Sequence, residues 1–167
     1  MPNPIETKMK QRLKKIKVIV FDFDGVFTDN SVYVDQNGQE SVRCSKSDGP
    51  GLRRLDQIGV SYLILSAEKN PVVTARGRKL GIEVLQGHED KLSVLTDLVR
   101  TRKLAFEEVA YVGNDLNDLG CLEAVGFPIA VSDAFPEVVH AASFVTSRAG
   151  GHGAVREVCD LLYKSFI

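Results

Sequence analysis

Short apolar strands alternate with amphipathic stretches of helical length from residue 17 onward, and this alternation constrains the fold more than any other feature. Strands are expected at 18–21, 62–65, 82–85, 109–112, 127–131 and 144–145. Helices are expected at 50–59, 70–80, 89–103, 115–125, 134–141 and 153–165. Short apolar strands that alternate with helices are typical of a parallel sheet buried on both faces. The sequence therefore predicts an α/β fold, a Rossmann-like parallel sheet with helices on both faces.

One segment interrupts the alternation between the first strand and the first helix. Residues 32–44 contain Asn37-Gly38 flanked by β-forming residues. Asn-Gly is the strongest short hairpin signal, because a type I′ turn needs a positive φ at both central residues. We therefore expect an inserted β-hairpin at 32–44. An isolated two-stranded ribbon is marginally stable in water, so this hairpin must pack on the body or on another subunit.

Composition excludes several classes of protein. The chain has 167 residues, which fits one domain, and its net charge of −1 excludes a basic protein that coats nucleic acid. No apolar stretch approaches the ~20 residues of a membrane helix, so neither nucleic acid nor a membrane is expected as a partner. Three widely spaced cysteines form no Cys-x-x-Cys pair, which argues against a disulfide framework or zinc finger and favours a cytoplasmic location. They are Cys44, Cys121 and Cys159.

The N-terminal segment is basic. Residues 1–16 are expected to form a lead ahead of a single domain that spans 17–167. No aromatic side chains are interleaved with its lysines and arginines, as a nucleic-acid platform would require. The segment is therefore interpreted as a solvated, helical or frayed lead.

Polar side chains follow four successive strands at the point where each strand ends. In an open parallel sheet, ligands bind beyond the carboxyl ends of the strands. Each side chain alone has an ordinary explanation as an N-cap, a turn residue or a surface charge. Together, in order along one edge, they indicate a functional site. The residues concerned are Asp22, Asp24, Ser66, Lys91, Asn114, Asp115 and Asp118.

These residue types suit phosphoryl transfer. An Asp carboxylate can attack phosphorus and form an aspartyl-phosphate, which divides one difficult step into two. A second Asp, two residues on, can protonate the leaving alkoxide and then deprotonate a water. Mg²⁺ would offset the repulsion between the carboxylates and the phosphate, and Asp and Asn oxygens suit it. A hydroxyl and a Lys can hold the equatorial phosphoryl oxygens.

The same residues resemble the four motifs of the haloacid dehalogenase-like (HAD) phosphatases. The motifs are Asp22-x-Asp24-Gly25-Val26-x-Thr28-Asp29, Ser66, Lys91 and Gly113-Asn114-Asp115-x-x-Asp118. The resemblance is greatest to a capless branch that includes 3-deoxy-D-manno-octulosonate 8-phosphate phosphatase, 2-keto-3-deoxynononate 9-phosphate phosphatase and the HAD domain fused to N-acylneuraminate cytidylyltransferases. It covers about 17–162, with further branch marks at 47–49, 70–73, 86–87 and 150–157. It implies a HAD-like fold with the small hairpin in place of a cap domain.

The resemblance also implies roles. Asp22 corresponds to the nucleophile and a metal ligand, and Asp24 to the general acid/base, with its backbone carbonyl on the metal. Ser66 and Lys91 correspond to the phosphate-holding residues. Asn114 stands where the family usually has an Asp ligand, so Mg²⁺ should bind less tightly. Asp115 or Asp118 could complete the metal site directly or through water.

For the substrate, the resemblance points to the loop after the second strand. Where octulosonate phosphatases commonly have an Arg after the Ser/Thr-Gly, this chain has Ala67-Glu68-Lys69, which is more similar to the nine-carbon acid phosphatase. Glu68, Arg76 and Lys79 are therefore substrate-binding candidates, as is Ser47. Arg76 and Lys79 have an equal alternative as an exposed helix face.

The sequence is thus interpreted as a Mg²⁺-dependent phosphatase of a phosphorylated ulosonic acid with nine or eight carbons, assembled as a homotetramer whose hairpins cover open sites. The alternative is a weakly catalytic or non-catalytic oligomerisation module associated with an N-acylneuraminate cytidylyltransferase. Retention of Asp22 and Asp24 argues against this alternative, and Asn114 keeps it open. A nucleotidyltransferase is excluded by size.

Overall fold

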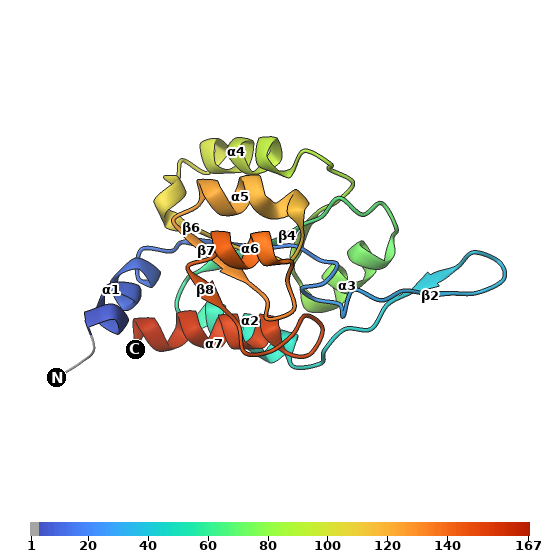
Figure 1. Ribbon diagram of the computed structural model, residues 1–167, viewed down its shortest axis with the longest axis horizontal. Helices are drawn as coiled ribbons and strands as arrows, with labels where there is room; N and C mark the ends of the chain where they lie inside the picture. The colour runs from blue at the N-terminus through green and yellow to red at the C-terminus, as the bar shows by residue number, and fades with distance from the viewer. Residues whose placement is uncertain (1–3) are drawn as a thin grey trace.

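A six-stranded parallel sheet forms the centre of the molecule, with helices on both faces (Figure 1). The computed structural model describes residues 4–167. The strand order is β5-β4-β1-β6-β7-β8. The chain builds outward from β1 to β5 and then crosses back to β6 on the other side of β1, which places the topological switch point at the carboxyl end of β1. The strands are β1 (Val18–Phe21), β4 (Ser61–Leu65), β5 (Glu83–Leu85), β6 (Val109–Gly113), β7 (Phe127–Ala130) and β8 (Phe144–Val145).

The helices divide into two layers, and the predicted α/β architecture is confirmed. On β1, Ile19 and Phe21 pack into one core and Val18 and Val20 into the other, because successive strand residues point to opposite faces. The first core lies under α1 (Pro4–Leu13), α2 (Asp48–Gln57), α3 (Val72–Leu80) and α7 (Ala154–Phe166). The second lies under α4 (Lys91–Thr101), α5 (Leu119–Ala124) and α6 (Pro136–Ala141). Two 3₁₀ turns, η1 (Phe106–Glu108) and η2 (Leu116–Asp118), flank β6.

The basic N-terminal segment forms helix α1, whose end is anchored on the domain; residues 1–3 lie outside the described residues. Leu13 and Ile16 are buried in the first core. The guanidinium of Arg12 lies 5.1 Å from the ring centroid of Phe127 and donates a 2.6 Å hydrogen bond to the carbonyl of Gly126. The basic side chains therefore remain at the surface while the apolar ones join the segment to the sheet.

The inserted hairpin is present and projects from the body (Figure 1). Its strands are β2 (Tyr33–Val34) and β3 (Glu40–Ser41), which pair antiparallel. Three consecutive apolar residues on its first arm are open to solvent: Val32, Tyr33 and Val34 are 51%, 64% and 60% exposed. The hairpin thus meets the body through its root and leaves its outer part uncovered within this chain.

The predicted hairpin is confirmed, but its turn is not the type I′ turn that Asn37-Gly38 favours. Gly38 takes the left-handed region, with φ of 76°, but Asn37 does not. The N–H of Gly38 donates to the carbonyl of Asp35, and the N–H of Asp35 donates to the carbonyl of Gln39. The side chain of Asp35 also accepts from the amides of Asn37 and Gln39, at 2.8 and 2.9 Å. An acidic side chain that bonds its own turn therefore favours a longer loop with one left-handed glycine.

No helix among residues 4–167 is long and apolar enough to cross a membrane.

Candidate active site

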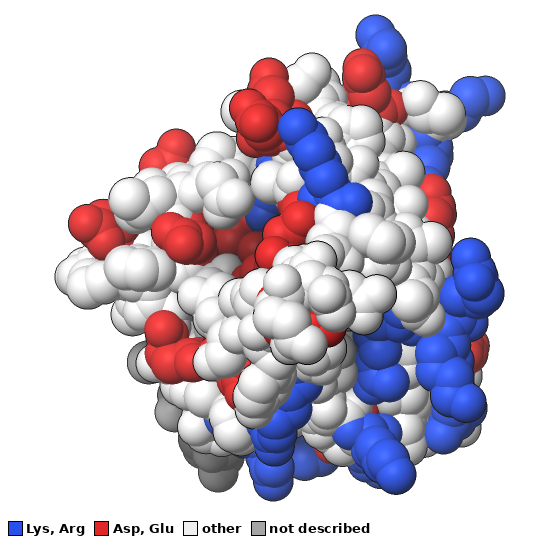
Figure 2. All heavy atoms as spheres, turned by 90° about the vertical axis from the view of Figure 1, so that its right-hand side faces the viewer, with Lys and Arg blue, Asp and Glu red and all other residues white. Residues whose placement is uncertain are grey.

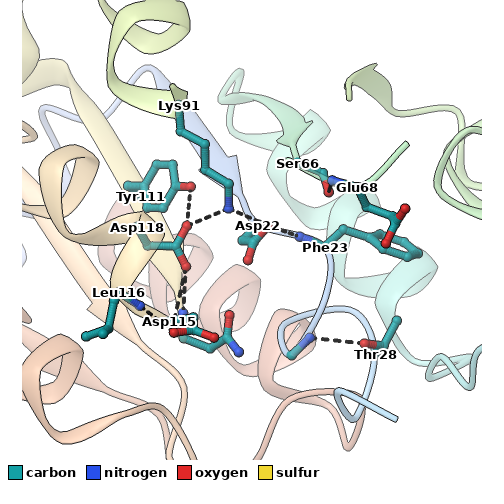
Figure 3. A network of polar contacts seen from close by, with 12 residues as sticks. Asp22, Phe23, Thr28, Ser66, Glu68, Lys91, Tyr111, Asp115, Leu116 and Asp118 are labelled. Carbon is teal, nitrogen blue, oxygen red and sulfur yellow. Dashed lines mark hydrogen bonds and ion pairs between the residues drawn. The ribbon is translucent and has the colours of Figure 1, made fainter. Parts of the chain in front are cut away.

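The loops that follow β1, β4, β5 and β6 meet at the carboxyl edge of the sheet. On this face, acidic side chains gather around a hollow, and Lys and Arg side chains lie mainly along the right side and the lower part of the view, with one beside the hollow (Figure 2). Inside the hollow is a pocket of about 80 Å³, and most of the predicted site residues line it. They are Asp22, Asp24, Ser66, Glu68, Lys91, Asn114 and Asp115. Figure 3 shows how several of these side chains face one another.

Asp22 directly follows the central strand β1 and is 5% exposed. Its N–H donates to the carbonyl of Val112 at 2.9 Å, which extends the pairing of β1 with β6. Its Oδ1 accepts from the amide of Phe23 at 2.7 Å and contacts the ammonium of Lys91 at 2.8 Å. Burial and the nearby charge of Asp118 raise the pKa of Asp22 to about 8, although Lys91 opposes the shift. Its ionised form therefore depends on positive charge in the pocket.

Lys91 is the first residue of α4 and is 2% exposed. Its Nζ lies 2.8 Å from both Asp22 and Asp118. Burial favours the neutral amine, but the two carboxylates outweigh it and raise the pKa of Lys91 above its ordinary value. Lys91 is therefore a fixed cation beside Asp22.

Asp118 is fully buried and holds the site together (Figure 3). Its Oδ1 accepts from Lys91 and from the hydroxyl of Tyr111, at 2.8 and 2.7 Å. Its Oδ2 accepts from the amides of Asn114 and Asp115, at 3.0 and 3.3 Å. Four donors already occupy this carboxylate, so its geometry suits positioning Lys91 and the loop after β6 rather than binding a metal directly. Sequence reasoning did not single out Tyr111, although a buried strand hydroxyl requires a partner.

Asn114 offers an unused oxygen to the pocket. Its Oδ1 is buried and has no hydrogen-bond partner, which is uncommon for a buried polar atom. Asp115 accepts from the amide of Leu116 at 2.6 Å and so caps η2. Gly25 allows this arrangement, because a Cβ there would lie 2.0 Å from Nδ2 of Asn114.

The donor set fits a divalent cation. Hard cations prefer carboxylate, amide and carbonyl oxygens, and the pocket combines Asp22, Asp24 and the unpaired amide oxygen of Asn114. Among residues 4–167, no group of three His, Cys, Asp or Glu side chains is arranged to hold a metal. A cation in this pocket would therefore need amide or backbone oxygens as well as carboxylates.

Asp24 is half-buried on the loop after β1. Burial, and then the charge of Glu68, raise its pKa; Lys91 opposes this shift, and Glu40 adds to it. The hydroxyl of the buried Thr28 accepts from the amide of Gly25 at 3.0 Å and so closes the loop that carries Asp24. A carboxyl that holds its proton more tightly than usual suits a general acid.

Ser66 and Glu68 occupy the loop after β4. The buried Ser66 donates its N–H to the carbonyl of Leu85 at 2.8 Å, and its Oγ accepts from the amide of Glu68 at 3.1 Å. Oε1 of Glu68 accepts from the amides of Lys69 and Asn70, at 2.7 and 2.8 Å. Its Oε2 makes no hydrogen bond within the described residues. Glu68 thus stabilises its own turn while it lines the pocket.

Three substrate-binding candidates lie outside this pocket. Arg76 donates to the carbonyl of Ser45 at 2.7 Å and lies 3.7 Å from the carboxylate of Asp48. The hydroxyl of Ser47 shares a 2.7 Å hydrogen bond with that of Ser45, at the start of α2. Lys79 is exposed on α3. Within one chain, these three residues do not line the pocket that contains Asp22 and Asp24.

A glycine-rich loop at 150–153 lies directly against the loop that follows β1. A Cβ on Gly150 would lie 1.8 Å from the carbonyl oxygen of Gly25, and one on Gly151 would lie 2.4 Å from the amide nitrogen of Asp29. The N–H of Gly151 donates to the carbonyl of Val26 at 3.1 Å. Only glycine allows this backbone to lie directly against the loop that carries Asp22 and its neighbours.

Comparison with known proteins places these motifs in a family context. The sequence profile of the haloacid dehalogenase-like hydrolases matches residues 61–158. The 3-deoxy-D-manno-octulosonate 8-phosphate phosphatase of Salmonella typhi is 39% identical over 160 residues, which cover 95% of this chain and 85% of that protein.

Two solved structures share the fold closely. The 3-deoxy-D-manno-octulosonate 8-phosphate phosphatase of Moraxella catarrhalis, solved with magnesium ion, phosphate ion and a KDO molecule, has a TM-score of 0.91 and 33% identity, covering 95% of this chain and 92% of that one. The cobalt-bound deoxy-D-mannose-octulosonate 8-phosphate phosphatase of Haemophilus influenzae has a TM-score of 0.88 and 33% identity, covering 93% and 92%.

Proposed function

Because the chain belongs to the haloacid dehalogenase-like hydrolases and is a phosphatase, we propose that it hydrolyses an eight-carbon ulosonic acid phosphate of the 3-deoxy-D-manno-octulosonate 8-phosphate type. The observation that carries the chemistry is the buried carboxylate of Asp22, held 2.8 Å from the ammonium of Lys91 at the end of the central strand. This carboxylate is desolvated, oriented and open to the pocket on one side.

In the first step, Asp22 attacks phosphorus. Its Oδ1 is engaged by Phe23 and Lys91, which leaves Oδ2 as the nucleophile. The bond from phosphorus to the sugar oxygen breaks as the aspartyl-phosphate forms, and Asp24 gives its proton to the leaving oxygen. Ser66 and Lys91 hold the phosphoryl oxygens as charge shifts between them.

In the second step, the ionised Asp24 takes a proton from a water, and the resulting hydroxide attacks the phosphorus of the aspartyl-phosphate. The acyl–phosphate bond breaks, inorganic phosphate leaves, and Asp22 is regenerated as a carboxylate. The same residue thus serves as acid and then as base, and its half-buried position at the pocket mouth suits both roles.

We propose Mg²⁺ as the cofactor, held by Asp22, the backbone carbonyl of Asp24 and Oδ1 of Asn114, with Asp115 nearby. When bound, the ion supplies the positive charge that keeps Asp22 ionised and offsets the charge of the phosphate. The unpaired Oδ1 of Asn114 supports this proposal. Because Asn114 is neutral, we expect lower affinity than with an Asp at this position.

Two alternatives differ in how well they are supported. The nine-carbon substrate rests on Ala67-Glu68-Lys69, whereas the relatives named above are eight-carbon acid phosphatases. A non-catalytic assembly module would not need Asp22, Asp24, Ser66 and Lys91 gathered in one pocket. The eight-carbon reaction is therefore the primary proposal.

We further propose a cytoplasmic homotetramer in which hairpins cover neighbouring sites. The exposed apolar residues Val32, Tyr33 and Val34 support an assembly role, because a ribbon with open edges and uncovered apolar side chains gains by docking.

The proposed function is tested by phosphate release from 3-deoxy-D-manno-octulosonate 8-phosphate and from 2-keto-3-deoxynononate 9-phosphate, each with Mg²⁺ and with EDTA. We expect Mg²⁺-dependent turnover with kcat/KM at least about tenfold higher for the eight-carbon substrate, a difference of ~1.4 kcal/mol in transition-state binding. A preference for the nine-carbon substrate would show that the eight-carbon assignment is wrong. Turnover that persists in EDTA would show that the reaction does not require Mg²⁺. Asp22→Asn serves as the inactive control.

A further inference from the structure

The root of the hairpin is fixed beside the mouth of the active site. Nδ2 of Asn70 donates to Oε2 of Glu40 at 3.1 Å, and Thr28 and Cys44 form an isolated β-bridge. Arg76 adds its 2.7 Å hydrogen bond to the carbonyl of Ser45. Although the tip of the hairpin projects away, these contacts hold Glu40 in a defined position relative to the loop after β4.

A second pocket of about 200 Å³, here called the outer pocket, adjoins the aspartate pocket. The two pockets share Asp24, Asn30 and Glu68. The hairpin root contributes Glu40 and Val42 to the outer pocket. A substrate whose phosphate lies against Asp22 therefore extends its next carbons past Glu40.

The outer pocket is lined by acidic side chains, and no basic side chain among the described residues lines it. Three carboxylates line it, those of Asp24, Glu40 and Glu68. Both glutamates act electrostatically on Asp24. Each glutamate has one oxygen engaged by the protein, and neither Oε1 of Glu40 nor Oε2 of Glu68 has a hydrogen bond within the described residues. Free carboxylate oxygens accept from hydroxyl groups and repel a second carboxylate.

We infer that Glu40 is a specificity-determining residue, which together with Glu68 accepts the hydroxyl-bearing carbons next to the phosphate and excludes a carboxylate from that position. The inference rests on the proposed function, because an ulosonic acid phosphate carries its carboxylate at the end of the molecule opposite the phosphate. Such a substrate places hydroxyls in the outer pocket and its carboxylate beyond it. Short phosphorylated acids place a carboxylate beside Glu40 and are disfavoured.

A matched pair of short phosphate esters tests this inference. 3-Phosphoglycerate and glycerol 3-phosphate differ in one group, a carboxylate against a hydroxymethyl, two carbons from the phosphate-bearing oxygen. Their inhibition constants are measured against p-nitrophenyl phosphate hydrolysis, in the wild type and in Glu40→Gln. We expect the wild type to bind glycerol 3-phosphate more tightly than 3-phosphoglycerate. Glu40→Gln should reduce the ratio of the two inhibition constants about three- to tenfold, because that is the effect of one charge a few ångströms away in a hydrated pocket.

High salt and control variants show whether the ratio of inhibition constants depends on the charge of Glu40 or on a change in the structure of the pocket. The wild-type ratio should shrink in high salt, because screening weakens repulsion between partly exposed charges. Glu40→Asp, which retains the charge, should keep most of the discrimination. Glu107→Gln, on η1 away from both pockets, should leave the ratio unchanged.

An unchanged ratio in Glu40→Gln would overturn the inference, as would a wild-type ratio that does not depend on salt. Failure of the proposed function has a different signature: the wild type would not turn over the eight-carbon substrate, whereas the ratio of the short esters would still respond to Glu40→Gln.

Discussion

Asp118 accepts four hydrogen bonds without lining the aspartate pocket, and it holds Lys91 beside Asp22. Lys91 meets both Asp22 and Asp118 at 2.8 Å, so its ammonium is fixed by two anions rather than one. Tyr111 donates to the same oxygen of Asp118 that Lys91 contacts. The site is therefore a buried chain of polar and charged contacts that extends from Tyr111 on β6 through Asp118 and Lys91 to Asp22.

Tyr111→Phe tests this chain of contacts. The substitution keeps the ring in the core and removes one donor from Asp118, while three other donors remain. We expect the fold to persist and kcat/KM to fall about 10–150-fold, as for the loss of one hydrogen bond to a charged group, ~1.5–3 kcal/mol. Steady-state kinetics checks the result. Tyr163→Phe, which removes a hydroxyl far from the pocket, is the matched control, and equal kinetics in the two variants would contradict the role given to Tyr111.

Asp48 predicts a pH dependence of stability. It is 1% exposed, and burial raises its pKa to about 7 even though Arg76 opposes the shift. The folded state therefore holds this proton more tightly than the unfolded chain, where an Asp titrates near ~4. The stabilising effect of this bound proton is complete below the unfolded pKa of ~4. It is lost as pH rises through the folded pKa of about 7.

Urea unfolding of the wild type and Asp48→Asn at about pH 5 and pH 8 measures this effect. The wild type should lose up to about 3 kcal/mol more of its unfolding free energy over this range than the variant, because the amide does not titrate. Asp22 titrates in both proteins, so its contribution cancels in the comparison. Parallel pH profiles would mean that Asp48 is ionised at low pH, as in a strong pair with Arg76.

At the scale of elements, two short loops position Asp22 and Asp24: the loop after β1 and the glycine-rich loop at 150–153. The loop after β1 carries Asp22 and Asp24 and lies directly on the glycines at 150–153. The hairpin extends from the same loop and returns to α2. The loop after β1 is thus held on one side by a glycine backbone, and the hairpin root lines the pocket next to it.

Gly150→Ala should displace the loop after β1, which carries Asp22 and Asp24. Its new Cβ would lie 1.8 Å from the carbonyl oxygen of Gly25, a backbone atom that cannot rotate away. A shift of about 1 Å in a catalytic loop reduces activity roughly 100-fold. Kinetics together with thermal unfolding distinguishes misplacement from loss of fold. Gly49→Ala, where the nearest atom is an ordinary 3.5 Å away, should remain active; wild-type activity in Gly150→Ala would refute the support role.

Val32→Lys combined with Val34→Lys tests the hairpin as an assembly element. Both valines are more than half exposed, and charges there should prevent docking on another subunit. Light scattering should give a tetramer for the wild type and smaller species for the double variant. Gln36→Lys, in the loop of the hairpin, adds charge without touching the apolar residues and should leave the assembly intact. A monomeric wild type, or an unchanged tetramer in the double variant, would exclude this role.

The sequence predicted the sheet well because buried strands have a strong local signal. The four-residue apolar run of β1 appears at the expected residues, and Asp22 follows it as expected. Local signals did not predict the turn at Asp35, where a side chain competes for the backbone amides. Nor did they predict the contact of Arg76 with Ser45, since two distant segments meet there only after folding.

At the scale of the whole molecule, strand order accounts for the position of the site. β1 lies between β4 and β6, so the loops from its two neighbours reach Asp22 from opposite sides. Ser66 arrives from β4, and Asn114 with Asp118 from β6. The polar residues that follow the strands are therefore distant in the chain and adjacent in space, as expected at a topological switch point.

In the proposed mechanism, Asp22 becomes phosphorylated during turnover. Rapid acid quenching of the wild type with Mg²⁺ and 3-deoxy-D-manno-octulosonate 8-phosphate labelled at phosphorus measures it directly. We expect protein-bound phosphate that hydroxylamine releases, as an acyl phosphate requires, and no such phosphate on Asp22→Asn. Turnover by the wild type without a labelled protein, or equal labelling of Asp22→Asn, would exclude this mechanism.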